Sequence, residues 1–409
     1  MDFQLPADDD PRRLAVRSWL AEHPLPTGRQ LAEAGYVAPH WPPPWGLGAD
    51  AIHQLIIDDE LTTAGVRLPM NPMGTGWGGP TILVGGTQAQ KDRYLWPMLA
   101  GDEFWCQLFS EPESGSDLAN LGTRAVRDGD EFVVNGQKIW TTAAEHSDFG
   151  ILIARTDPSV PKHKGISYFI CPMHLPGIEV RTITEMTGGH HFCEVFFTDV
   201  RIPAANLVGQ LHDGWRLAKV TLGNERVSLS TGGVLWGNGP TGLELIDTLR
   251  AAGPLEHPVL RQQAAKVYTE HVLLDLIRIR TLSASLKGQE PGPEASIRKL
   301  LADEHGQHVM TLARAAIGCD AMLSAGDGRD YQPERDGRVL TEQGAVDDLD
   351  HPSWYHGFMF SQALTIGGGT WAVQRNIIAE RVLGLPHDVD VTKGLSWAEA
   401  QRVPNGARS

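Results

Sequence analysis

The hydrophobic period of this chain changes twice, and this change constrains its fold more than any other feature. Up to about residue 105, apolar residues recur at steps of three and four, a pattern typical of amphipathic helices. They then alternate at every second position to about residue 210, as in strands, before long helical patterns return. This order, without βαβ alternation, predicts an α+β fold in which a β module lies between two helical ones. We expect a helical domain at 1–105, a β domain at 106–212 and a helical domain at 213–409.

Turn residues divide the strand region. Asp128-Gly129-Asp130 and Asn135-Gly136 interrupt the alternating stretch RAVRDGDEFVVNGQKIWTT. Asn-Gly favours a tight hairpin because both residues tolerate positive φ, so we expect hairpins at both places. A polar, acidic stretch at 324–354 predicts a long surface loop, with a functional lid as the alternative.

Charge and composition exclude several classes of protein. The chain of 409 residues has a net charge of −15, so most of its surface repels nucleic acid and anionic membranes. Its apolar runs are far shorter than the ~20 residues that a membrane helix needs, and no secretory signal is visible, so we expect a cytoplasmic protein. The dispersed cysteines have no metal-binding spacing, which predicts reduced core thiols and no metal site. They are Cys106, Cys171, Cys193 and Cys319.

Two motifs in the strand region suit a flat, polar ligand. LFSEPESGSD, residues 108–117, packs hydroxyl groups and backbone N–H donors into a turn that can bind an anion or a polar ring edge, although an ordinary loop fits the same letters. In NGQKIWTT, strand alternation places Trp140 and Thr142 on one face. An indole beside a hydroxyl suits a heteroaromatic cofactor.

Together with CEVFFTDVRIPAANLVG and QRNIIAERVLGLP, these motifs resemble the acyl-CoA dehydrogenase family, in order and over nearly the whole chain. The resemblance implies a helical N-terminal domain, a central β domain and a C-terminal four-helix bundle with flavin adenine dinucleotide (FAD) between them. It also implies α,β-dehydrogenation of an acyl-CoA, in which a base removes the α-proton and the flavin takes the β-hydride. The implied FAD contacts are Leu108, Phe109, Ser110, Gly115, Ser116, Trp140, Thr142 and Thr370, and the implied acyl-CoA contacts are Ser116, Asn224 and Arg226.

The catalytic base is not where many family members carry it. Their Y-E-G-T sequence is G-G-G-T here, so Gly368 has no carboxylate but keeps a backbone N–H that can polarise the thioester carbonyl. Other members carry the base on a bundle helix just before an Arg. At the matching place TLGNERVSLS has Glu225 before Arg226, which makes Glu225 the candidate base. Without the resemblance, a solvated Glu on an amphipathic helix is the commoner interpretation.

Two family motifs that contact the FAD of a neighbouring subunit are missing. R-x-x-F-G is absent from LIDTLRAAGPLEHPVLRQQ, and Q-x-x-G-G is disrupted at Ala315 and Cys319. A homodimer would lose a charge-assisted bond worth about 1.5–3 kcal/mol. The pattern resembles actinobacterial α2β2 enzymes, several of which act on steroid side-chain acyl-CoAs, and predicts a paralogous partner subunit. A homotetramer that uses Arg250 or Arg261 instead is the alternative.

Two other functions stay open at this point. The chain could be a non-catalytic structural subunit of a heteromeric dehydrogenase, or a flavin oxidase or monooxygenase on the same fold. Within the family, electron-transferring flavoprotein is the implied electron acceptor.

Overall fold

The computed structural model describes residues 6–228, 234–236, 239–285, 292–318, 352–387 and 389–403. The predicted acidic loop lies outside these residues up to residue 351, and so does Cys319.

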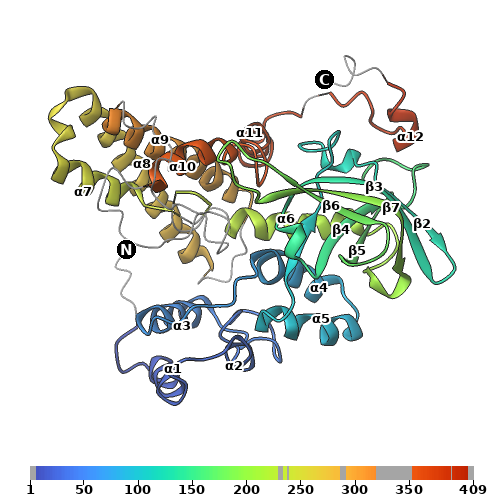
Figure 1. The fold of residues 1–409 in the computed structure, drawn as a ribbon, viewed down its shortest axis with the longest axis horizontal. Helices are drawn as coiled ribbons and strands as arrows, with labels where there is room; N and C mark the ends of the chain where they lie inside the picture. Colours follow the sequence, from blue (N-terminus) through green and yellow to red (C-terminus); the bar gives the residue numbers. More distant parts are fainter. Residues whose placement is uncertain are drawn as a thin grey trace.

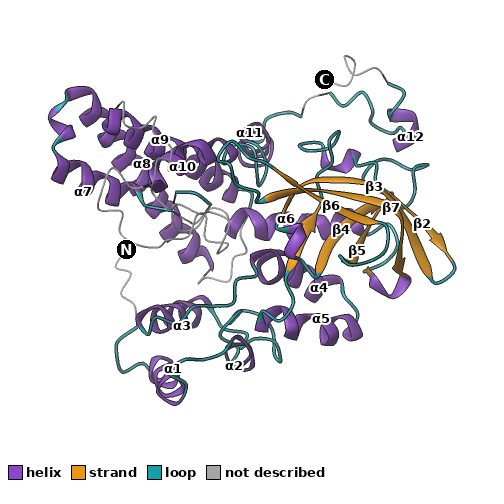
Figure 2. Ribbon diagram, viewed as in Figure 1, coloured by secondary structure: helices purple, strands orange, loops and turns teal. Residues whose placement is uncertain are grey.

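The described chain forms the three layers that the change of period predicts (Figure 1). Helices of the first hundred residues lie along one side of a β-sheet, and a bundle of longer helices lies at the sheet's end, as the colouring in Figure 2 shows. The first layer comprises α1 (Pro11–Glu22), α2 (Gly28–Glu33), α3 (Ala51–Thr63), η1 (Pro72–Gly78), α4 (Gly79–Gly85) and α5 (Gln88–Ala100).

Within the described residues the sheet has eight strands: seven follow the order β6-β7-β3-β2-β4-β5-β8, and the eighth, β1, lies off this path and pairs in parallel with β4. One apolar cluster lies within the sheet domain, and a second joins strands β1, β4 and β5 to helices α4 and α5. The strands are β1 (Trp105–Leu108), β2 (Arg124–Asp128), β3 (Glu131–Thr142), β4 (Phe149–Arg155), β5 (Ile166–Pro172), β6 (Ile178–Ile183), β7 (Phe192–Pro203) and β8 (Leu207–Val208).

The hairpin predicted at Asn135-Gly136 is wrong, whereas the one at Asp128–Glu131 joins β2 to β3. Asn135 and Gly136 lie inside β3, where its register against β7 shifts. The Asn135 side chain exchanges two 3.0 Å hydrogen bonds with Asp199 of β7, and a Cβ at Gly136 would collide with Thr123. Pairing with a distant strand therefore turns the local turn signal into a β-bulge.

Helix α6 (Gly214–Ser228) lies between the sheet and the bundle and contacts α4, β5 and α9 (Figure 1). The bundle closes over its own apolar core, which includes Leu245, Val267, Met310 and Trp354. Its helices are α7 (Gly242–Ala252), α8 (Pro258–Ser285), α9 (Ala295–Ile317), α10 (Pro352–Phe360) and α11 (Trp371–Ile377).

The C-terminal helix α12 (Trp397–Ala400) packs on the β domain instead of the bundle (Figure 1). Trp397 Nε1 donates a 3.1 Å hydrogen bond to the Asn120 carbonyl, and the Trp397 ring lies 4.7 Å from the Arg155 guanidinium. Arg155 is buried and donates to three backbone carbonyls, and this burial lowers its pKa to about 10.

Cys106, Cys171 and Cys193 are buried free thiols, as predicted. No group of three or more His, Cys, Asp or Glu among the described residues is arranged to hold a metal. No described helix is long and apolar enough to cross a membrane.

Candidate active site

Hydroxyl contacts fix α6 one turn before the predicted base. Thr221 Oγ1 lies 2.8 Å from Thr81 Oγ1 of α4 and 3.0 Å from the Tyr168 hydroxyl of β5. All three side chains are fully buried, so these contacts satisfy groups that water cannot reach. They fix the position of α6 relative to α4 and β5. Glu225 follows Thr221 by one helical turn, so its position is fixed as well.

Glu225 points inward, and only 7% of the residue is exposed. Gln107 Nε2 of β1 donates a 3.1 Å hydrogen bond to Glu225 Oε2. Burial raises the pKa of Glu225 above its ordinary value, although the Gln107 hydrogen bond and the positive charges of Lys299 and Arg226 oppose the rise. A buried carboxylate with a raised pKa suits a general base. The solvated-surface interpretation of Glu225 is wrong.

The side chains of the two residues that flank Glu225 donate hydrogen bonds to backbone carbonyls of α6. Asn224 Nδ2 donates to the Val220 carbonyl at 3.0 Å, and Arg226 Nε donates to the Leu222 carbonyl at 3.2 Å. Both side chains are half-buried, and their predicted contact with acyl-CoA stays a prediction.

The glycines that replace the usual base adopt a conformation that favours glycine. Gly368 and Gly369 have φ values of 66° and 88°, in the left-handed region where a Cβ is unfavourable. A Cβ at Gly367 would lie 2.6 Å from the Trp236 ring, so an indole fills the space beside this glycine. The close approach of that ring accounts for Gly367.

Three backbone donors of the glycine loop, residues 367–370, are available to a ligand, whereas the Gly367 N–H donates to the Ala363 carbonyl at 2.9 Å. Among the described residues, none accepts a hydrogen bond from the N–H groups of Gly368, Gly369 or Thr370. The Thr370 hydroxyl caps α11 by accepting from the Val373 N–H at 3.2 Å. Three successive N–H donors suit an oxygen that gains negative charge.

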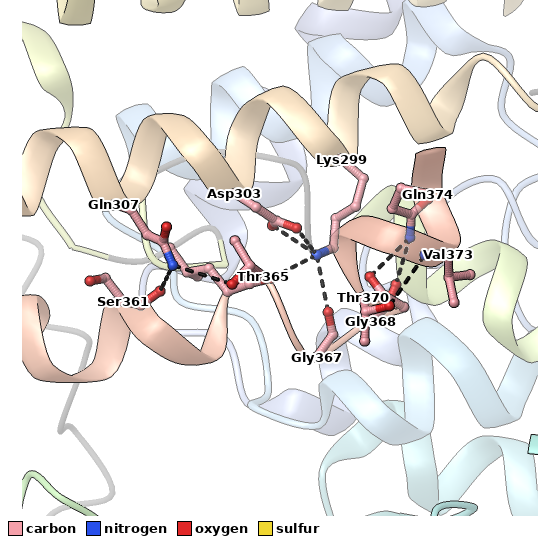
Figure 3. Close-up of polar contacts among 12 residues, drawn as sticks. Lys299, Asp303, Gln307, Ser361, Thr365, Gly367, Gly368, Thr370, Val373 and Gln374 are labelled. Atoms are coloured by element: carbon pink, nitrogen blue, oxygen red, sulfur yellow. Dashed lines mark hydrogen bonds and ion pairs between the residues drawn. The ribbon is translucent and has the colours of Figure 1, made fainter. Parts of the chain in front are cut away.

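One face of α9 contacts the segment that runs from Ser361 to Gly367 (Figure 3). Lys299, Asp303 and Gln307 follow one another at four-residue spacing, and of the three only Lys299 contacts a glycine of the loop, at the Gly367 carbonyl. Gln307 Nε2 donates to the Ser361 carbonyl and to Thr365 Oγ1 at 3.2 and 3.3 Å. None of these three residues was predicted from the sequence.

Trp140 and Thr142 lie at the C-terminal end of β3, where Trp140 is accessible. Trp140 is 57% exposed and has a φ of 60°, at a second register shift between β3 and β7. Thr142 is half-buried, while Thr141 between them is 1% exposed, so Trp140 and Thr142 share the open side. The Trp140 ring packs edge-on against Phe192 at 5.9 Å. An exposed indole in a strained backbone position suggests a ligand-binding role.

The LFSEPESGSD turn separates into buried and open parts. Leu108 and Phe109 are buried in apolar clusters, so their side chains are not available to a ligand. The Ser110 carbonyl accepts from the Ile139 N–H at 2.9 Å, which ties the turn to β3. Gly115 and Ser116 are exposed, and a Cβ at Gly115 would meet no atom within 4 Å.

A buried ion pair anchors this turn. Lys138 Nζ donates to Glu111 Oε1 at 2.7 Å, and the Gly122 and Thr123 N–H groups also donate to the Glu111 carboxylate. Burial alone would raise the pKa of Glu111, but Lys138 and the backbone donors outweigh it and lower that pKa.

Ring contacts, continued along the chain from Phe192 to His191, connect the end of β3 with the glycine loop. Next to Phe192, the His191 ring lies 6.4 Å from Phe360, which packs edge-on against Trp236 at 5.5 Å. Trp236 in turn contacts Gly367. These contacts place the end of β3, with Trp140, and the glycine loop, with Gly368, at the same boundary between sheet and bundle.

Comparisons with known proteins match each of the three layers. Sequence models of the acyl-CoA dehydrogenase N-terminal, middle and C-terminal domains match residues 11–102, 106–200 and 212–383. Acyl-CoA dehydrogenase FadE34 of Mycobacterium tuberculosis is 40% identical over 87% of this chain, which spans 45% of that longer protein. Acyl-CoA dehydrogenase IpdE1 of Mycolicibacterium smegmatis is 34% identical over 88% of each chain.

Two solved structures share the fold over nearly the whole length. One chain of the ChsE4-ChsE5 complex from Mycobacterium tuberculosis has a TM-score of 0.71 and 29% identity, with 95% of this chain and 100% of that one covered. One chain of the structure described as "Tcur3481-Tcur3483 steroid ACAD" has a TM-score of 0.73 and 28% identity, with the same coverage. With a matching model for each of its three layers, the chain belongs to the acyl-CoA dehydrogenase family.

Proposed function

We propose that this protein catalyses the FAD-dependent α,β-dehydrogenation of an acyl-CoA thioester, with Glu225 as the base. The observation that carries the proposal is a carboxylate that is 7% exposed, has a raised pKa and lies on the helix between sheet and bundle. The same boundary holds the free N–H donors of the glycine loop. A base for the α-proton and donors for the thioester oxygen are the two parts that this reaction requires of the protein.

The residues present fit FAD. The exposed Trp140 indole offers a flat apolar surface, and Thr142, at the end of β3, and Thr370, at the start of α11, are both half-buried. Ser110, Gly115 and Ser116 form an accessible turn, in which the open space at Gly115 leaves room for a ligand. Leu108 and Phe109 contribute through their backbone, because their side chains are buried. When bound, FAD supplies the acceptor for the β-hydride.

The chain's own residues handle the proton. Glu225 removes the α-proton, and the Gly368 N–H donates to the thioester oxygen as negative charge grows there. Gln107 holds the Glu225 carboxylate in place through its 3.1 Å hydrogen bond. We assign Ser116, Asn224 and Arg226 to the acyl-CoA, the last two because they flank Glu225 on α6.

We propose that the acyl group is bulky, with steroid side-chain acyl-CoAs as the leading candidates. The support is similarity to a structure described as a steroid acyl-CoA dehydrogenase, at 28% identity and a TM-score of 0.73. Electron-transferring flavoprotein is the electron acceptor that we propose for the reduced enzyme.

We propose that the protein works as a hetero-oligomer, α2β2, with a paralogous subunit. A stripe on α8 supports this assembly: Tyr268, Val272 and Leu276 recur every fourth residue and are 51%, 37% and 57% exposed. A regular apolar stripe on a long helix is typical of a contact with another protein. The structurally similar ChsE4-ChsE5 and Tcur3481-Tcur3483 assemblies each carry two subunit names. This chain supplies the base, and its partner supplies the missing contacts to FAD.

Anaerobic mixing of the co-purified complex with a panel of acyl-CoAs tests the function. Loss of oxidised-flavin absorbance, with the unsaturated acyl-CoA as product, is the expected result. An unchanged flavin spectrum in a complex that binds acyl-CoA would support a non-catalytic subunit. Oxygen consumption without an added electron acceptor would support an oxidase or monooxygenase.

A further inference from the structure

Lys299 of α9 forms a buried ion pair beside the glycine loop, and the role inferred for it below rests on the proposed function. Lys299 and Asp303 are 0% and 2% exposed, and Lys299 Nζ lies 2.7 and 2.6 Å from the two carboxylate oxygens of Asp303. The ammonium also donates to the carbonyls of Leu364 and Gly367 at 3.2 and 3.1 Å (Figure 3). A buried ion pair of this kind rarely stabilises a fold more than apolar residues would, so its position needs another reason.

The peptide bond between Gly367 and Gly368 connects Lys299 with the proposed site. In a planar trans peptide, the C=O of one residue and the N–H of the next point in opposite directions. Lys299 holds the Gly367 carbonyl, and it therefore fixes the direction of the Gly368 N–H. A glycine pair with φ values of 66° and 88° has no Cβ to restrict its backbone, so an external contact has to fix this orientation.

Gln374 fixes the orientation of the next two peptides, Gly368–Gly369 and Gly369–Thr370, through their carbonyls. It is fully buried, and its Nε2 donates to the Gly368 and Gly369 carbonyls at 3.1 and 3.2 Å (Figure 3). The N–H groups of Gly369 and Thr370 lie at the other ends of these peptides. The carbonyls of Gly367, Gly368 and Gly369 are thus held by Lys299 and Gln374, while the N–H groups of Gly368, Gly369 and Thr370 find no acceptor among the described residues.

We propose that Lys299, held by Asp303, is a positioning residue that orients the Gly368 N–H toward the thioester carbonyl. It acts through one peptide plane and does not touch the substrate. An ammonium on the carbonyl end of a peptide also polarises that peptide and strengthens its N–H as a donor. The positive charge of Lys299 additionally reaches Glu225, where it opposes the rise in pKa that burial causes.

The test measures the thioester carbonyl directly. The probe is tert-butylacetyl-CoA with an isotope-labelled carbonyl, because its β-carbon bears no hydrogen and no hydride can pass to the flavin. Infrared difference spectra of the complex should show the carbonyl band at lower frequency than in free probe. Lys299→Met combined with Asp303→Leu removes both charges, leaves no buried ion unpaired and should therefore fold. We expect this double variant to bind the probe and to lose most of the frequency shift.

Gln307→Leu is the matched control, because Gln307 lies on the same face of α9 and contacts the same segment but no glycine carbonyl. It should keep the wild-type shift. A full shift in the Lys299–Asp303 double variant, or an equal loss in Gln307→Leu, would overturn the proposal. If the wild-type complex binds no acyl-CoA at all, the proposed function fails and the inference falls with it. Binding without flavin reduction by any substrate would contradict only the proposed function.

Discussion

At the scale of single residues, the proposed role of Glu225 as the base carries a cost in stability. Its ordinary pKa is 4.5, and burial raises the pKa in the folded protein. The protonated carboxyl therefore stabilises the folded protein fully below pH 4.5, and this contribution is lost as pH rises through the raised folded pKa. Above that range the site holds a buried charge that the fold itself does not need.

We expect Glu225→Gln to raise the melting temperature at alkaline pH, because it removes the buried charge and keeps the shape of the side chain. The gain should shrink as pH falls toward the ordinary carboxyl pKa, where both side chains are neutral. Thermal unfolding across this pH range measures the effect, with Glu256→Gln as the control because Glu256 is exposed. A lower melting temperature for Glu225→Gln at alkaline pH would show that the carboxylate is well stabilised where it lies.

Two pairs of residues show what the sequence could and could not predict at this scale. The resemblance singled out Glu225, which is buried, and its role as the base stays a prediction. Lys299 and Asp303 were missed, because a Lys and an Asp four residues apart are typical of a solvated helix surface. Their burial depends on the 361–374 segment, which joins α9 from more than fifty residues along the chain. Gln107 and Gln374 carried no local signal either.

At the scale of elements, hydrophobic period predicted the layers and failed where distant segments meet. Asn135-Gly136 is a sequence typical of a hairpin turn, yet its conformation is determined by contacts with Asp199 and Thr123 in other parts of the β domain. Helix α12 is too short for a periodic pattern, and contacts with Asn120 and Arg155 decide where it lies. Nonlocal contacts of this kind are invisible to local propensity.

The docking of α12 gives a prediction at this scale. Trp397→Ala removes the hydrogen bond to Asn120 and the ring over Arg155, and should weaken docking of the C-terminal segment by about 2–3 kcal/mol. Native-state proteolysis should then cleave the segment faster by one to two orders of magnitude. Val389→Ala is the control, because Val389 lies in the same segment and is 82% exposed. Equal cleavage of both variants would show that Trp397 does not hold the segment.

At the scale of the whole molecule, the three-layer fold was predicted by the change of period, and the family by the motifs. The domain limits at residues 105 and 212 stay a prediction. So does the assembly, since a missing motif indicates a partner only if no other residue replaces it. Arg250 is available for that role at the surface, where it forms an exposed ion pair with Asp247.

The apolar stripe of α8 tests the assembly. Val272→Asp together with Leu276→Asp places charges on an exposed helix face, so the subunit should still fold but should no longer bind its partner. Native mass spectrometry of co-expressed subunits should show α2β2 for the wild type and separate chains for the variant. The FAD content should fall in parallel. A wild-type chain that forms a homotetramer with full FAD when expressed alone would exclude the hetero-oligomer.

The central claim, that the base lies on α6 and not on the glycine loop, is tested most directly by exchange of the substrate's α-hydrogens. The complex is incubated with tert-butylacetyl-CoA in heavy water, and loss of the α-hydrogen signal is followed by proton magnetic resonance. We expect the wild type to exchange these hydrogens and Glu225→Gln to slow the exchange by about 10²–10⁴-fold, the contribution typical of a general base. Exchange at the wild-type rate in Glu225→Gln, with the probe still bound, would contradict the account.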